Sequence, residues 1–250
     1  PSMEVNRIQL DDGIEILKAT VNLTRNTVFT IEPTNGVNAS NFSSFVTQRR
    51  AELVLGGIYG VGNWTLISEG RRLSGSGGGY TILGLDSYNQ PEMITQADNR
   101  SIPFQPEKYW FAVQAGPRLV RNGTANVTTD GVRNQGHRTL DIAVSAPRSG
   151  IGFSQDGTKL YYVMTTENSR GISLPELATI MASERVGCWQ AMALDGGDGP
   201  ALAHNSSVVQ GPGSRNQPFL ILIYNSMQAP QALRTKWEQL QPANISPASG

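Results

Sequence analysis

The chain has 250 residues, and its 20 Lys and Arg are balanced by 20 Asp and Glu. A formal net charge of zero provides no long-range field for nucleic acid, so we expect no nucleic-acid partner. No apolar run approaches the roughly 20 residues of a membrane-spanning helix, and the one cysteine, Cys188, excludes an internal disulfide. The length, with no repeat or clean linker, predicts a single domain over residues 1–250.

The first half of the chain is predicted to consist mainly of strands, because β-branched and apolar runs alternate with turn-forming residues. One change of period interrupts them. Phe42, Phe45 and Val46 recur at helical spacing, which predicts a helix over 40–50. The predicted strands span residues 14–21, 27–31, 51–59, 65–68, 71–73, 80–85, 92–95, 110–114 and 119–120.

The second half contains two strong local signals. Asp156-Gly157 predicts a hairpin between strands at 149–153 and 159–165. Ser173 and Glu176 form a capping box, which predicts a helix over 173–186. Hairpin-linked strands favour the α+β class, a single domain of mixed, mostly antiparallel β-sheet with a few packed helices, over a doubly wound parallel sheet. Further elements are expected as strands at 188–194 and 219–224 and a C-terminal helix over 231–241.

The apolar strand at 188–194 runs directly into a turn, Asp195-Gly196-Gly197-Asp198. A carboxylate at a strand end is held rigidly and still reaches a cleft. Successive glycines leave backbone N–H groups uncovered, and such a concavity suits an anion or a sugar hydroxyl. An ordinary Asp-Gly turn without a binding role is the alternative interpretation.

Metal ligands are scarce in this sequence. His137 and His204 are the only histidines, which excludes a zinc site built from several histidines. The cluster Asp156, Asp195 and Asp198 lacks the spacing of a calcium loop. We therefore expect no metal and no other cofactor.

Asn-x-Ser/Thr sequons are frequent and predict an exported or secreted protein, whether or not they are glycosylated. The start, Pro1-Ser2-Met3, looks like a cloning remnant, so we expect a targeting segment to have been removed. The sequons begin at Asn22, Asn38, Asn41, Asn63, Asn99, Asn122, Asn126, Asn205 and Asn244.

Several motifs, in the same order and spacing, resemble those of the phosphodiester glycosidase domain family. The resemblance covers roughly residues 35–225. Ser173-Leu174-Pro175-Glu176-Leu177-Ala178 is similar to that family's Thr-Leu-x-Glu-Leu-Ala helix start. The other matching segments are the strand around Gly56-Gly57, Gly116-Pro117-Arg118-Leu119-Val120, Pro147-Arg148-Ser149-Gly150-Ile151-Gly152 and Ala193-Leu194-Asp195-Gly196-Gly197.

This resemblance implies a hydrolase that cleaves a sugar from a sugar-1-phosphodiester at the anomeric carbon. Arg148 would clamp the phosphate, because guanidinium binds phosphate oxygens bidentately. Asp195 would stabilise the positively charged transition state or position water. Asp198 is a second carboxylate candidate, and His137 is a candidate for phosphate binding or for proton transfer near neutral pH. The substrate-binding candidates are Gly56, Gly57, Ser149, Gly196, Gly197, Arg215 and Asn216.

Three departures from the family pattern keep other interpretations open. Leu55 and Ala193 stand where the family has Asn, and Gly199 stands where it has Ser. One alternative is therefore a non-catalytic module that binds a carbohydrate or a sugar phosphate. Another is an O-glycosidase that uses Asp195 and Asp198 as its carboxylate pair. Arg148 and Asp195 would form only a structural salt bridge in the simplest alternative.

Overall fold

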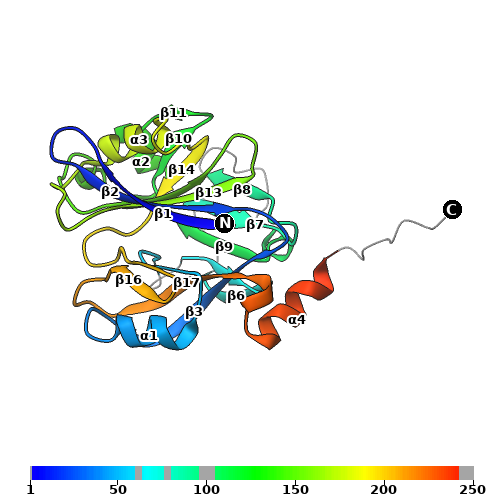
Figure 1. Cartoon of the computed structure of the whole chain (residues 1–250). Helices are drawn as coiled ribbons and strands as arrows, with labels where there is room; N and C mark the ends of the chain where they lie inside the picture. The colour runs from blue at the N-terminus through cyan, green and yellow to red at the C-terminus, as the bar shows by residue number, and fades with distance from the viewer. Residues whose placement is uncertain (1, 60–63, 76–79, 96–104, 242–250) are drawn as a thin grey trace.

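The computed structural model describes residues 2–59, 64–75, 80–95 and 105–241. Its elements form three sheets with a few helices around them (Figure 1). The α+β class is confirmed, and every strand pairing within the described ranges is antiparallel. The extent of the domain over 1–250 stays a prediction.

The seven-stranded sheet includes Ser149, and its strands β12 and β14 adjoin Arg148 and the turn that begins at Asp195. Its central strands β12 and β14 pair so that Gly150 lies opposite Ala193, which brings Arg148, just before β12, and Asp195, just after β14, to the same edge of the sheet. The predicted hairpin around Asp156-Gly157 is present as β12 and β13. In spatial order the strands are β1 (Met3–Gln9), β2 (Glu15–Asn22), β13 (Lys159–Thr165), β12 (Ser149–Phe153), β14 (Gln190–Ala193), β10 (Arg118–Arg121) and β11 (Thr124–Ala125).

Two five-stranded sheets complete the β-structure. The first consists of β16 (Ser207–Gln210), β15 (Leu202–His204), β4 (Leu53–Leu55), β17 (Gln217–Asn225) and β3 (Thr27–Val37). The second consists of β6 (Arg71–Ser74), β5 (Leu66–Ser68), β9 (Phe111–Ala115), β7 (Thr81–Leu85) and β8 (Pro91–Thr95). The predicted strand at 51–59 is too long, because the pairing of β4 ends before Gly56-Gly57. β1 and the hairpin β15–β16 were not predicted.

The three predicted helices begin near the predicted residues, and all of them are shorter than expected. The capping box of Ser173 and Glu176 is confirmed, but α3 ends at Ala182 instead of 186. α2 and the 3-10 turn η2 lie in a polar region for which no helix was predicted. The helical elements are α1 (Phe42–Arg49), η1 (Pro106–Lys108), α2 (Thr129–Asn134), η2 (Thr139–Asp141), α3 (Leu174–Ala182), η3 (Ser226–Gln228) and α4 (Gln231–Leu240).

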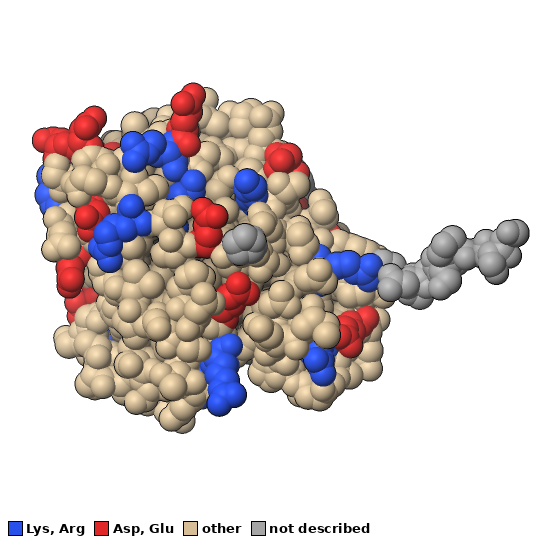
Figure 2. All heavy atoms as spheres, viewed as in Figure 1, with Lys and Arg blue, Asp and Glu red and all other residues tan. Residues whose placement is uncertain are grey.

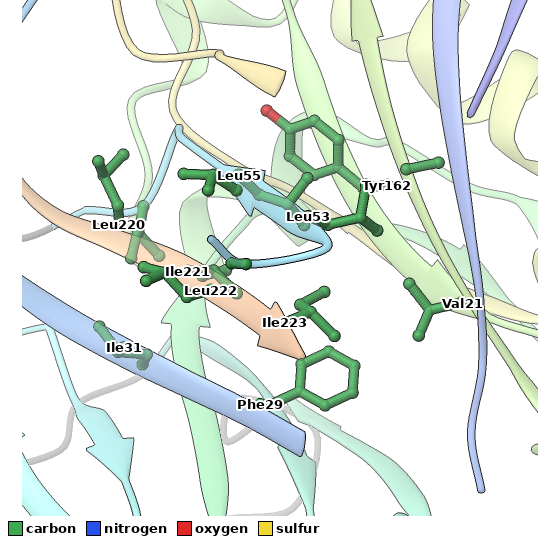
Figure 3. Packing of buried hydrophobic residues seen from close by; sticks show 14 of the residues in the cluster. Val21, Phe29, Ile31, Leu53, Leu55, Tyr162, Leu220, Ile221, Leu222 and Ile223 are labelled. Carbon is green, nitrogen blue, oxygen red and sulfur yellow. The ribbon is translucent and has the colours of Figure 1, made fainter. Parts of the chain in front are cut away.

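The main core lies between the sheets. Apolar side chains of β17 pack with those of β4 and β3, and Tyr162 of β13 reaches this layer from the seven-stranded sheet (Figure 3). Tyr162 is fully buried, and its hydroxyl donates to the carbonyl of Gly56 at 2.9 Å. This hydrogen bond fixes the chain at the end of β4, where it turns toward the cleft. A second cluster packs α3 against the outer face of the same sheet.

The surface agrees with the balanced composition. On the face shown in Figure 2, acidic and basic side chains are interspersed and most of the area carries neither. Within the described ranges, no helix is long and apolar enough to cross a membrane. Cys188 is buried, and burial raises the pKa of its thiol. The sequons at Asn63, Asn99 and Asn244 lie outside the described residues.

Candidate active site

The backbone around Asp195 is fixed by Gly57 and Ser149, two of the candidate substrate-binding residues. The N–H of Asp195 donates to the carbonyl of Gly57 at 2.7 Å. The hydroxyl of Ser149 donates to the carbonyl of Asp195, also at 2.7 Å. Gly57 has φ +94°, and a Cβ there would lie 2.9 Å from the Ser149 hydroxyl oxygen. Gly57 and Ser149 therefore hold Asp195 in place from behind, and only glycine fits at position 57 without strain.

The carboxylate of Asp195 is paired with a different arginine from the one expected. Oδ2 of Asp195 lies 2.5 Å from Nη2 of Arg215, and Arg148 makes no salt bridge with it in the part of the chain described. The Asp195 side chain is 24% exposed. Burial raises the pKa of this carboxyl, against the opposing effect of Arg215. The structural Arg148–Asp195 salt bridge is thus not formed.

Arg148 is held by three backbone carbonyls. Its Nε donates to Ile172 at 3.1 Å, and its Nη2 donates to Asp141 at 3.0 Å and to Val144 at 2.6 Å. Burial lowers the pKa of Arg148, although a guanidinium remains charged at neutral pH. No hydrogen bond from Nη1 is found within the described ranges. Arg148 is therefore a rigidly oriented cation whose Nη1 can still donate hydrogen bonds to a bound anion.

Asp195 and Arg148 both line a cleft of about 410 Å³. One wall of this cleft is aromatic. The ring centroids of Tyr59 and Trp64 are 4.4 Å apart, and those of Trp64 and Tyr80 are 4.1 Å apart. None of these three side chains was singled out from the sequence: Tyr59 and Tyr80 were placed at the ends of predicted strands, and Trp64 directly before one, whereas in the structure all three lie in loops. Their position at strand ends was the only available signal.

His137 also lines the cleft, and its burial disfavours the role in proton transfer near neutral pH that was expected as one of two possibilities. Its ring packs edge-on against Tyr80, and Gly116 leaves the space that the ring occupies. Nε2 is buried without a hydrogen bond in the described structure. Burial lowers the pKa of His137 to about 4, so the ring is neutral at pH 7. Acid–base exchange near neutral pH requires a pKa closer to 7.

The neutral His137 predicts a specific pH dependence of stability. Its folded pKa of about 4 lies below the ordinary histidine value of 6.5, so the unfolded chain takes up a proton first as the pH falls. The neutral ring of His137 therefore contributes fully to the unfolding free energy above pH 6.5, and this contribution is lost as the pH falls toward 4. We expect His137→Phe to reduce the loss of unfolding free energy between pH 7 and about pH 4.5 by about 2 kcal/mol. Urea unfolding of both proteins at the two pH values measures this, and an unchanged difference contradicts the assignment.

Asp198 faces the loop before β17 and is not among the residues that line the cleft. Its Oδ2 accepts from the backbone N–H of Arg215 at 3.3 Å and from the Ser214 hydroxyl at 3.5 Å. Its carbonyl accepts from the N–H of Gly213 at 2.9 Å. Asp198 thus positions the loop that carries Arg215. A second carboxyl group among the residues that line the cleft is that of Asp141, which sequence reasoning missed, and the role of Asp198 stays a prediction.

A comparison of the two turn carboxylates tests this assignment. We expect Asp198→Ala to lower kcat/KM less than about tenfold, because it removes only weak hydrogen bonds to a loop. Asp195→Asn is expected to have a far larger effect. The kcat/KM of the two variants is measured by steady-state kinetics on the same substrate. Equal losses in the two variants would place Asp198 in direct contact with substrate and support the Asp195–Asp198 pair.

The remaining candidates divide between the cleft and its neighbourhood. Gly196 and Gly197 line the cleft, but the N–H of Gly197 donates to the carbonyl of Pro147 at 3.2 Å. It is therefore not free for an anion. Arg215 and Asn216 line a smaller cavity of about 200 Å³ that shares Asp195 and Tyr59 with the cleft. Gly56 packs behind the site, where a Cβ would lie 2.6 Å from the carbonyl oxygen of Gly199.

No group of three or more His, Cys, Asp or Glu side chains suited to hold a metal ion occurs among the described residues. The chemistry that this cleft supports on its own is electrostatic. A fixed guanidinium suits an anion, and a partly buried carboxylate stabilises positive charge that develops nearby. The aromatic wall suits the apolar face of a ring.

Comparisons with known proteins identify the family and the fold. A family model described as phosphodiester glycosidase matches residues 25–224. No curated protein matches the chain. The structure is similar to the zebrafish N-acetylglucosamine-1-phosphodiester alpha-N-acetylglucosaminidase catalytic domain auto-inhibited by its pro-peptide, with a TM-score of 0.66 and 18% identity over 90% of this chain and 84% of that one.

Two bacterial structures are also similar. A hypothetical protein from Synechocystis has a TM-score of 0.70 and 13% identity, over 88% of this chain and 61% of that one. A putative exported protein from Burkholderia pseudomallei has a TM-score of 0.51 and 11% identity, over 84% of this chain and 74% of that one. At such identities these likenesses concern the fold, and function must be argued from the site.

Proposed function

The chain belongs to the phosphodiester glycosidase family, and we propose that its cleft cleaves a sugar from a sugar-1-phosphodiester at the anomeric carbon. The observation that carries the proposal is the pair of Arg148 and Asp195 in one cleft. Arg148 is immobilised by three carbonyls, which accept from Nε and Nη2, so its Nη1 can donate to a phosphate. Asp195 is partly buried and is fixed through its backbone.

The leaving group explains why this pair suffices. Cleavage at the anomeric carbon releases a phosphate monoester, whose second pKa is about 6. Such a leaving group is already a stabilised anion and needs little proton donation, so a histidine that is neutral at pH 7 is no obstacle. Arg148 would bind the phosphate throughout, and Asp195 would stabilise the cationic sugar-like transition state or orient the attacking water.

Arg215 would keep Asp195 ionised. Burial alone raises the pKa of Asp195, and the guanidinium 2.5 Å away opposes that shift. An ionised carboxylate is the form that stabilises positive charge. The aromatic wall of Tyr59, Trp64 and Tyr80 would pack against the sugar ring and fix its orientation beside Asp195.

Product analysis on two classes of substrate tests the proposal. Sugar-1-phosphodiesters and matched O-glycosides are incubated with the protein, and free sugar and phosphate monoester are measured. We expect turnover of the diesters only. Turnover of O-glycosides alone would favour a carboxylate pair, for which the structure offers Asp195 and Asp141 in one cleft. Tight binding without turnover of either class would favour the non-catalytic module.

The same proposal places the substrate outside the cytoplasm. The frequent sequons suit an exported protein, and one similar structure is that of a putative exported protein. The substrate would then be a glycan-derived or cell-envelope phosphodiester. Fractionation of the native host cells, followed by detection of the protein in each fraction, tests the location.

A further inference from the structure

Tyr59 carries a hydroxyl group that has no hydrogen-bond partner among the described residues. A tyrosine hydroxyl that is taken out of water usually finds a partner, and those of the buried Tyr109, Tyr162 and Tyr224 each donate to one. The side chain of Tyr59 is half-buried and packs against the main core. Its oxygen is not one of the enclosed polar atoms, so a bound molecule can reach it. A ligand can therefore supply the partner that the described chain does not.

The ring of Tyr59 is held in one position beside Asp195. It stacks on Trp64, with 17° between the ring planes. Two residues before it, the carbonyl of Gly57 accepts from the N–H of Asp195, which ties the two backbone segments together. Tyr59 and Asp195 both line the main cleft and the smaller cavity next to it. Both residues therefore lie where the two cavities adjoin.

The hydroxyl of Tyr59 lies in the field of both groups that carry the proposed reaction. Burial raises the pKa of this hydroxyl, and the carboxylate of Asp195 raises it further. The guanidinium of Arg148 has the next largest effect and opposes the shift. Because the net shift is upward, the hydroxyl keeps its proton at neutral pH. It is a neutral donor close to a carboxylate and to a cation.

We propose that Tyr59 is a catalytic residue, whose hydroxyl donates a hydrogen bond to the oxygen that leaves the anomeric carbon. The bond between that carbon and the phosphate oxygen breaks, and its electron pair moves to the oxygen. Asp195 faces the sugar side of this bond and Arg148 binds the phosphate side, so a donor near both lies beside the oxygen between them. Tyr59 keeps its proton, because the released phosphate monoester, with a second pKa of about 6, is stable as an anion. This role rests on the proposed function, because it concerns the same bond.

Tyr59→Phe tests the role, because it removes the hydroxyl and keeps the ring that stacks on Trp64. We expect kcat for the methyl ester of a sugar-1-phosphate to fall about 10²-fold, the usual loss when one donor aimed at developing charge is removed. The Tm should not fall, because the hydroxyl has no partner in the described part of the protein. Release of free sugar and thermal unfolding measure the two effects.

A change of leaving group separates this role from a structural one. In the 4-nitrophenyl ester, the released 4-nitrophenyl phosphate is a weaker base than methyl phosphate, so its leaving oxygen needs less stabilisation. The loss of kcat in Tyr59→Phe should therefore be about fivefold smaller for the 4-nitrophenyl ester than for the methyl ester. A displaced aromatic wall would lower kcat for both esters by the same factor.

Tyr88→Phe is the matched control, because Tyr88 is 56% exposed and is not among the residues that line the cleft. It should leave kcat unchanged for both esters. If Tyr59→Phe keeps the wild-type kcat, or loses the same factor on both esters, the role of Tyr59 is wrong while the proposed function stands. If the wild type cleaves neither ester, the proposed function fails, and the role of Tyr59 fails with it.

Discussion

Asp195→Asn is expected to lower kcat on a sugar-1-phosphodiester by about 10²- to 10³-fold, a loss comparable to that of one preorganised group that stabilises charge in the transition state. The amide keeps the shape of the side chain and removes its charge. The backbone contacts to Gly57 and Ser149 do not involve the carboxylate, so they should persist. A lower kcat would therefore result from the missing negative charge of Asp195 and not from a displaced side chain.

The same substitution should not lower Tm. Burial raises the folded pKa of Asp195. A carboxyl with a raised folded pKa destabilises the protein once the pH exceeds that pKa, so the ionised group has a cost at pH 7 that Asn removes. The lost ion pair involves Arg215, whose side chain is 57% exposed. Such a pair contributes at most about 1 kcal/mol. Calorimetry at pH 7 should show an equal or higher Tm.

Asp156 provides the matched control, because it also lies in an Asp-Gly turn. Its Oδ1 accepts from the Ser154 hydroxyl at 2.7 Å and from the backbone and side chain of Thr158. These hydrogen bonds lower the pKa of Asp156 to about 2, which means that the ionised form stabilises the fold. Asp156→Ala should lower Tm and leave kcat unchanged. If Asp195→Asn behaves in that way instead, Asp195 is a turn residue without a catalytic role.

Arg148→Lys is expected to lower kcat/KM by about 10²- to 10³-fold although the charge is kept, a loss comparable to that of one transition-state hydrogen-bond donor. An ammonium group cannot reach the carbonyls of Asp141, Val144 and Ile172 in fork geometry and also donate to a phosphate. We also expect weaker inhibition by the phosphate monoester product, since Arg148 binds product as well as substrate.

The unfolding free energy of Arg148→Lys shows whether a loss of activity comes from a missing phosphate contact or from a destabilised fold. We expect only a small loss of unfolding free energy, because the hydrogen bonds to Asp141 and Val144 are partly or fully exposed, where water can replace the donor, and the carbonyl of Ile172 still accepts from the N–H of Ala146 at 3.1 Å. Arg170→Lys is the matched control, because Arg170 pairs with Asp12 and Glu176 away from the cleft. It should keep full activity. Product inhibition of Arg148→Lys equal to that of the wild type would show that Arg148 is only a structural residue.

The sequence by itself determined the local structure on which the site is built. Asp156-Gly157 specified a hairpin and Ser173 with Glu176 specified a helix start, because these signals act between residues that are neighbours in the chain. The strand that ends before Asp195 and the motifs that identify the family could also be predicted from residues that are neighbours in the chain.

The tertiary structure decided which side chains meet. Arg215 is 20 positions from Asp195 and pairs with it, whereas Arg148 binds carbonyls of Asp141, Val144 and Ile172. Residues 59, 64 and 80 form an aromatic wall although no sequence period links them. Asp198 lies three residues after Asp195 and faces another loop. Local signals specify backbone shape, but these contacts depend on how β4, β12, β14 and β17 pack, which is set by the burial of the whole core.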